Sequence, residues 1–263
     1  MSGVEAGTTE PVGVYLVDKP AGLSSFAVVR RLRWLLNIRK VGHAGTLDPF
    51  ASGLLLLCAG RTATRHIETF MAGTKRYLAR LQLGVETSTQ DPEGQVLSRQ
   101  AVAVDTAAIR SCLAGMQGEQ MQVPPAFSAL KHHGRPLYSY ARQGIYIEKA
   151  ARPVQIYRLE MLAYDDRRHE LDIAVTCSRG TYIRVLAGDI GTALGCGAHL
   201  SALRRTQSGP FGVGEAVDGR LLLGDAGEQG RALLMAARMP VAEAVLRAER
   251  HRADSRFQLA GIP

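Results

Sequence analysis

Apolar and polar residues alternate with a period of two along several segments of the chain, which predicts β-strands. The alternation is clearest over residues 77–83 and 171–175. Short apolar runs at 14–17 and 54–59 are typical of strands that are buried on both faces. Because hairpin turns and helical segments separate these strands, we predict an α+β fold with a mixed, largely antiparallel sheet flanked by helices.

Apolar residues at helical spacing, preceded by side chains that cap helices, predict several helices. Ser24 or Ser25 is placed to cap a helix that ends near Leu36. The predicted buried face of this helix consists of Phe26, Val29, Leu32 and Leu36. The other predicted helices run from Asp105 to Leu113, Thr181 to Leu194, Leu221 to Ala237 and Val241 to Arg252.

The charge of the chain favours a polyanionic partner. Its 263 residues carry a formal net charge of +8, with a sequence pI near 9.6, and 46% of them are hydrophobic. Acidic residues are absent from three stretches, 19–47, 120–147 and 190–214. The cations of these stretches either line a surface that follows phosphates or form ordinary solvated faces of a basic protein.

The cysteines and the apolar runs indicate a cytoplasmic protein that has no metal site and no membrane association. The four cysteines include no Cys-x-x-Cys pair, and free thiols suit a reducing compartment. Residues 1–10 lack the apolar core of a signal peptide. The longest apolar run, at 54–59, is too short to cross a bilayer.

A glycine-rich loop at residues 42–53 contains one carboxylate, Asp48. No other acidic residue occurs between Asp18 and Asp48, and the interval holds six lysines and arginines. Nearby positive charge predicts a lowered pKa for Asp48, and so a permanent anion suited to act as a nucleophile or charge stabiliser. The alternative is an aspartate that only caps a turn before Pro49.

The loop is one of several motifs spread along the chain. The motifs lie at 13–25, 42–53, 75–79, 83–84, 87–94, 123–131, 137–138, 141–142, 177–184 and 203–206. In their order and spacing they closely resemble the TruB family of tRNA pseudouridine synthases, and the resemblance covers roughly residues 12–217. The resemblance implies the pseudouridine synthase fold and an isomerase that converts the T-loop uridine of tRNA, at position 55, to pseudouridine.

The resemblance also implies roles for individual residues. Asp48 matches the catalytic aspartate, which acts on a nucleotide flipped out of the RNA. Arg184 matches the arginine paired with it, Tyr77 an active-site tyrosine that stacks on the uracil, and Lys19 and Pro20 a supporting motif. The reaction adds no atom and oxidises nothing, so we expect no cofactor. Whether Asp48 attacks C1′, attacks C6 or promotes elimination to a glycal stays open.

Further positions are predicted to contact the RNA. Leu203 matches a hydrophobic residue that lines the uracil pocket. His43 either stacks in the place that the flipped base leaves or hydrogen-bonds its own loop. The cations predicted to bind RNA are Lys131, Arg135, Arg142 and Arg205. The expected partner is the T stem-loop of tRNA, bound by a monomer.

The expected organisation is a flexible N-terminus (1–11), a catalytic domain (12–217) and a helical C-terminal segment (218–263). An insertion is predicted at about 120–152, and the resemblance implies that this insertion and the segment before Asp48 grip the RNA. Many relatives carry a small RNA-binding β-barrel after the catalytic domain. The strand pattern here is too weak for a complete barrel, so the chain is either naturally short or incomplete.

The sequence leaves two other classes of function open. One is a tRNA-binding protein or folding chaperone with a spent active site. The other is a hydrolase that uses Asp48. A glycosidase of the usual kind needs two carboxylates, and the motifs around Asp48 offer no second one.

Overall fold

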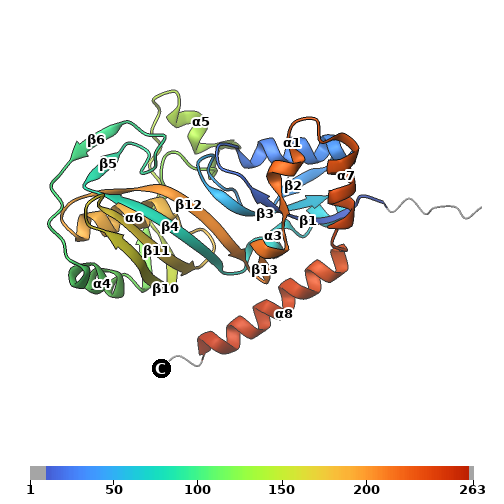
Figure 1. The fold of residues 1–263 in the computed structure, drawn as a ribbon. Helices are drawn as coiled ribbons and strands as arrows, with labels where there is room; N and C mark the ends of the chain where they lie inside the picture. The colour runs from blue at the N-terminus through green and yellow to red at the C-terminus, as the bar shows by residue number, and fades with distance from the viewer. Residues whose placement is uncertain (1–9, 261–263) are drawn as a thin grey trace, which may run out of the picture.

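The computed structural model describes residues 10–260, with side chains described for residues 10–253. The predicted flexible N-terminus therefore lies almost entirely outside the described residues. Within this range the chain forms one ten-stranded sheet and two small hairpins, with helices on both faces of the sheet (Figure 1). The strands are β1 (Gly13–Lys19), β2 (Val41–His43), β3 (Ser52–Ala59), β4 (Lys75–Leu83), β5 (Val85–Thr87), β6 (Val96–Arg99), β7 (Gly118–Gln122), β8 (Lys131–His132), β9 (Arg135–Pro136), β10 (Arg152–Asp165), β11 (Glu170–Cys177), β12 (Ala198–Ser208), β13 (Phe211–Gly212) and β14 (Val217–Asp218).

The large sheet has the strand order β14-β1-β3-β12-β4-β11-β10-β7, with β2 paired to β3 and β13 paired to β12. Two ladders are parallel among the described strands, β1 with β14 and β3 with β12, and the remaining ladders of this sheet are antiparallel. The predicted α+β fold with a mixed, largely antiparallel sheet is confirmed.

Helices cover both faces of the sheet because the strands alternate apolar side chains between the faces. In β1 and β3, Val17 and Leu55 pack toward α1 and α7, whereas Leu16 and Leu54 pack toward the opposite cluster, which includes α8. A third cluster lies between β4, β10, β11, β12 and the helices α4 and α6. The helices are α1 (Ser25–Leu36), α2 (Arg61–Thr64), α3 (Ile67–Met71), α4 (Thr106–Gly115), α5 (Leu137–Ala141), α6 (Ile183–Ala193), α7 (Gly227–Ala236) and α8 (Val241–Ala260), with 3-10 turns at Val213–Glu215 and Gly219–Leu222.

Two of the predicted helix starts are confirmed. The Ser24 side chain accepts a hydrogen bond from the Ala27 N–H at the start of α1, and the Asp105 side chain does the same for Ala108 at the start of α4. The predicted inward position of Phe26 is wrong, because this side chain is 56% exposed. Val28 and Leu35 take part in the buried face instead.

Two other helix predictions need correction. Thr181 does not cap a helix; its hydroxyl donates to the Ser178 carbonyl, and α6 begins only at Ile183. The single helix predicted over 221–237 is a 3-10 turn followed by α7, because Gly224 lies between them with a positive φ.

The predicted insertion begins slightly later than expected. Residues 118–122 form β7, the edge strand paired with β10, so the excursion from the sheet spans 123–151. It contains the β8–β9 hairpin and α5, and projects above the sheet in Figure 1. Beyond Asp218, the described chain continues as a 3-10 turn, α7 and α8. None of the described helices is long and apolar enough to cross a membrane.

Candidate active site

The loop of residues 44–51, which joins β2 to β3 and carries Asp48, is held by buried polar side chains. The hydroxyl of Ser25 accepts a hydrogen bond from the Leu47 N–H at 2.8 Å and donates one to the Leu47 carbonyl at 2.9 Å. Arg205, on β12, is 2% exposed and donates to three carbonyls of the loop and of β3. They belong to Gly45 (3.0 Å), Thr46 (3.4 Å) and Leu54 (2.8 Å).

The support beneath this loop is a single row of residues across four strands. The row runs from β1 through β3 and β12 to β4 and consists of the successive partners Lys19, Gly53, Arg205 and Tyr77. Residues paired in this way point to the same face of the sheet. A Cβ at Gly53 would lie 2.2 Å from the Arg205 carbonyl oxygen, and Gly53 has a φ of +103°. Only glycine therefore fits between the two cationic residues.

Lys19 is fully buried, and its ammonium group binds the Asp48 loop and the segment that precedes α1. Its Nζ donates to the carbonyls of Pro20 (2.9 Å), Leu23 (2.6 Å) and Pro49 (3.3 Å). Burial lowers the pKa of Lys19 to about 8, against the attraction of Asp48, which raises it. Lys19 and Pro20 thus lie beside the candidate site, and the ammonium group of Lys19 is hydrogen-bonded to backbone carbonyls.

Asp48 forms an ion pair with Arg184, the second residue of α6. The Nε atom of Arg184 lies 2.9 Å from Oδ2 of Asp48, and the guanidinium also donates to the carbonyls of Thr89 (2.8 Å) and Phe127 (2.6 Å). The Arg184 side chain is 3% exposed, whereas that of Asp48 is 33% exposed. The carboxylate is therefore accessible from outside while its partner is enclosed.

Asp91 is a second carboxylate at this site, and sequence reasoning missed it. Its Oδ2 atom lies 3.3 Å from Nη1 of Arg184, and its Oδ1 atom accepts hydrogen bonds from the Thr89 hydroxyl and the Glu93 N–H. The expectation that Asp48 has no carboxylate neighbour is wrong, because Arg184 binds both aspartates. The available signal was the position of Asp91 within the motif at 87–94.

The predicted lowering of the pKa of Asp48 is also wrong. Burial raises the pKa of this carboxyl and Asp91 adds to the increase, whereas Arg184 and Lys19 oppose it. Lys19 acts on Asp48, but other cations that precede Asp48 in sequence are engaged elsewhere. Arg31, for example, donates to carbonyls beyond β14. Proximity in sequence therefore overestimated the positive charge around this carboxylate.

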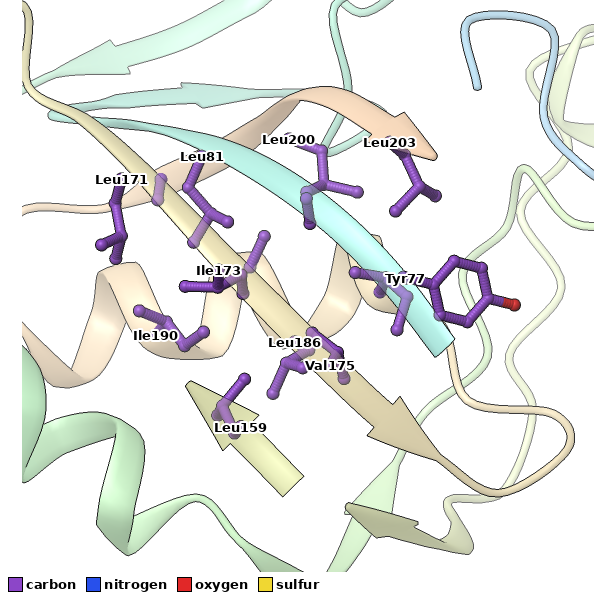
Figure 2. Close-up of a cluster of buried hydrophobic side chains, with 14 of the residues drawn as sticks. Tyr77, Leu81, Leu159, Leu171, Ile173, Val175, Leu186, Ile190, Leu200 and Leu203 are labelled. Atoms are coloured by element: carbon purple, nitrogen blue, oxygen red, sulfur yellow. The ribbon is translucent and has the colours of Figure 1, made fainter. Parts of the chain in front are cut away.

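Tyr77 lies at the end of the third hydrophobic cluster, where the cluster meets the loop. Figure 2 shows its hydroxyl directed away from Leu81 and Ile173, with Leu203 at the same end of the cluster. Tyr77 is 9% and Leu203 8% exposed. Burial raises the pKa of Tyr77, and the charge of Arg205 and a hydrogen bond from it act in the opposite direction.

His43 ends β2 immediately before the loop, in register with Leu57. Its ring is half-buried, and its Nδ1 atom has no hydrogen-bond partner. Burial and then the charge of Arg205 lower the pKa of His43, which keeps the ring neutral near pH 7. A neutral imidazole next to the Asp48 loop retains an aromatic face for stacking.

The four cations predicted to bind RNA separate into two groups. Lys131, Arg135 and Arg142 are exposed on the insertion, and the two arginines lie over tyrosine rings of α5. Arg205 is buried and hydrogen-bonded to the Asp48 loop. The prediction that Arg205 contacts RNA is therefore corrected: it supports the loop from within.

Among the described residues, no group of three or more His, Cys, Asp or Glu is arranged to hold a metal ion. The four cysteines are free, and Cys58, Cys177 and Cys196 are buried. The charged groups that meet at the candidate site are Lys19, Asp48, Asp91, Glu93, Arg184 and Arg205. The site thus presents the accessible Asp48 carboxylate, with the exposed Glu93 carboxylate near it, beside an aromatic and apolar surface.

This fold is that of a pseudouridylate synthase. Residues 33–183 match the model of the TruB family pseudouridylate synthase N-terminal domain, and residues 184–239 match that of the tRNA pseudouridylate synthase B C-terminal domain. The chain belongs to the TruB family.

Sequence similarity to known proteins extends over most of the chain. A protein from Desulfotalea psychrophila named tRNA pseudouridine synthase B is 55% identical over 222 residues, which are 82% of this chain and 90% of that protein. A protein of the same name from Thiobacillus denitrificans is 53% identical over 199 residues, or 76% of this chain and 66% of that protein.

Solved structures of related proteins share the fold. One chain in a Cbf5–Nop10–Gar1 complex has a TM-score of 0.66 and 29% identity, covering 90% of this chain and 62% of that one. A chain in an H/ACA ribonucleoprotein bound to a substrate RNA containing 2′-deoxyuridine has a TM-score of 0.64 and 26% identity. The match covers 91% of this chain and 62% of that one. The chain thus spans a little under two thirds of these structural relatives.

Proposed function

We propose that this protein isomerises the T-loop uridine of tRNA, at position 55, to pseudouridine, with Asp48 as the catalytic carboxylate. The observation that carries the proposal is the ion pair in which a buried Arg184 holds a partly exposed Asp48 at 2.9 Å. The guanidinium binds the ionised form of the carboxylate and fixes its position. That arrangement is suited to nucleophilic or electrostatic catalysis.

The reaction balances without a cofactor. The N1–C1′ bond breaks, the uracil rotates, the C5–C1′ bond forms, and C5 loses a proton while N1 finishes protonated. Asp48 assists by attack on the ribose or the base, or by promoting departure of the uracil. In this proposal the Tyr77 ring stacks on the uracil with its hydroxyl toward the C5 proton, and Leu203 lines the pocket.

The target uridine of a folded loop must leave its stack to reach Asp48, at a cost of about a few kcal/mol. We assign His43 to the vacated position, because its neutral half-buried ring is next to the Asp48 loop. The exposed cations of the insertion, Lys131, Arg135 and Arg142, are assigned to the phosphates of the T stem-loop. We propose that the enzyme acts as a monomer in the cytoplasm.

The test is incubation of the protein with an unmodified tRNA transcript, followed by position-resolved mapping of pseudouridine. Conversion confined to position 55 supports the proposal. Conversion elsewhere, or binding of tRNA without conversion, contradicts it. The second outcome would favour a tRNA-binding or chaperone role.

A further inference from the structure

The outer face of α1 carries two large aromatic side chains that the core does not use. Phe26 is 56% and Trp34 61% exposed. They are eight positions apart, with Arg30 and Arg33 between them at helical spacing, so all four lie on one face. We call these four residues, Phe26, Arg30, Arg33 and Trp34, the α1 stripe.

Arginines accompany both aromatic rings of the stripe. The guanidinium carbons of Arg30 and Arg33 lie 6.0 and 5.8 Å from the centroid of the Phe26 ring. That of Arg31 lies 4.4 Å from the centroid of the Trp34 ring. Arg33 also donates to the Val41 carbonyl at 3.0 Å, and this bond restrains its side chain. Aromatic faces and fixed guanidinium groups are therefore presented together.

The sequence around the stripe carries charge of one sign. Helix α1 contains three arginines and no acidic residue, and the stretch 19–47 contains no acid at all. A polyanion that also offers flat aromatic rings complements such a surface. Single-stranded or looped RNA has both properties, because its bases stack on aromatic side chains while its phosphates pair with arginines.

The stripe starts at the candidate active site. Ser25, the first residue of α1, is hydrogen-bonded twice to Leu47, which directly precedes Asp48. From there a helix of 12 residues extends about 18 Å at roughly 1.5 Å per residue. Figure 1 shows α1 on the same upper side of the molecule as α5 of the insertion.

We infer that the α1 stripe is a second RNA contact surface, on which unpaired nucleotides of the substrate other than the flipped uridine stack. The inference rests on the proposed function for the identity of the RNA. It assigns a role to an aromatic face that the fold leaves exposed beside the Asp48 loop, and it extends RNA binding away from the insertion.

The chain supplies its own reporter, because Trp34 is its only tryptophan. In the Asp48→Asn protein, which is expected to bind tRNA without turnover, Trp34 fluorescence excited at 295 nm should be quenched as unmodified tRNA is added. The quench should saturate together with binding measured on filters. In a matched protein that carries Trp34→Phe and Leu97→Trp, with the reporter on β6, saturation with tRNA should leave fluorescence unchanged.

Affinity gives a second readout. Phe26→Ala with Trp34→Ala should weaken tRNA binding by about tenfold or more, since stacking on an aromatic side chain contributes measurably for each base. Leu97→Ala, which removes a side chain that is 68% exposed on β6, should bind as the parent does. Circular dichroism and thermal melting identify any variant that fails to fold, and the quench in the Asp48→Asn protein then decides alone.

Unchanged Trp34 fluorescence at saturating tRNA would overturn the inference. If the unaltered protein still converts uridine 55, the proposed function survives that failure. Quenching by vesicles of phosphatidylglycerol but not by tRNA would assign the stripe to a lipid surface and likewise overturn it. Quenching by tRNA alone is the result expected.

Discussion

Arg184 binds Asp48 through Nε at 2.9 Å and Asp91 through Nη1 at 3.3 Å, and its guanidinium also holds the carbonyl of Phe127 at the start of the insertion. One buried side chain therefore connects the accessible carboxylate, a buried carboxylate and the segment expected to hold the RNA. Because a guanidinium is planar and permanently charged, these partners fix its orientation. The position of Asp48 depends on this arrangement.

Arg184→Lys should keep the positive charge but lose the planar fork that serves four partners. We expect the rate at saturating tRNA to fall by about a hundredfold, because a displacement of roughly 1 Å at a reacting group costs that much. Arg184→Gln should in addition lower the free energy of unfolding by about 3–5 kcal/mol, because Asp91 is left buried without its partner. Single-turnover kinetics and urea melts measure the two effects. Equal rates for Arg184→Lys and the parent would contradict this role.

Arg205→Gln should lower the catalytic rate although the side chain is shielded from solvent. The substitution removes the donors to Gly45 and Thr46 and the positive charge beside Tyr77. Arg204→Gln is the matched control, because the neighbouring Arg204 is 39% exposed and pairs with Asp18 outside the site. We expect the control to retain the rate and to lose no more than about 1 kcal/mol of stability. Similar losses for both variants would show that Arg205 has no special position.

The acid limb of the rate profile should report Asp48. Burial raises the pKa of Asp48, so the active anion should be lost, as pH falls, at a higher pH than an exposed aspartate would show. Asp91→Asn removes a neighbouring negative charge and should move the midpoint to lower pH. Single-turnover rates from pH 4 to 8 on a hairpin substrate test both statements. A midpoint that moves upward in Asp91→Asn would exclude this electrostatic account.

Neutralising Lys131, Arg135 and Arg142 together should weaken RNA binding and flatten its dependence on salt. The slope of log affinity against log salt should change by about 0.7–0.9 for each phosphate that the variant no longer neutralises. Arg167→Gln with Arg168→Gln is the control, because these cations lie in the β10–β11 hairpin, at the end of the strands away from Arg184. The control slope should match that of the parent. An unchanged slope in the triple variant would make the insertion a solvated face.

The local pattern of apolar, polar and capping residues was sufficient to predict much of the fold. The period of two placed β4 and β11, and Ser24 and Asp105 gave correct starts for α1 and α4, because these features depend on near neighbours. Burial around the site was not predictable in this way. Arg205 resembled a surface cation until the sheet register placed it opposite Gly53 and beneath the loop.

The candidate site was also predictable only in part. The motifs identified Asp48, Tyr77 and Arg184 as individual candidate residues. The role of Asp91 follows only from its tertiary contact with Arg184, which lies 93 positions away in the numbering. Similarly, Phe26 has the apolar character of a core residue, and only the packing of α1 against the sheet turns it toward solvent.

The central claim is that the Asp48 carboxylate isomerises a uridine in the T loop of tRNA. The most direct measurement is position-resolved pseudouridine mapping of an unmodified tRNA transcript after incubation with the parent protein and with Asp48→Asn, at equal occupancy of the RNA. The amide is nearly the same size but neutral, so affinity should stay within a few-fold while conversion at position 55 is abolished. Comparable conversion by Asp48→Asn, or conversion by the parent at another position only, would contradict the account.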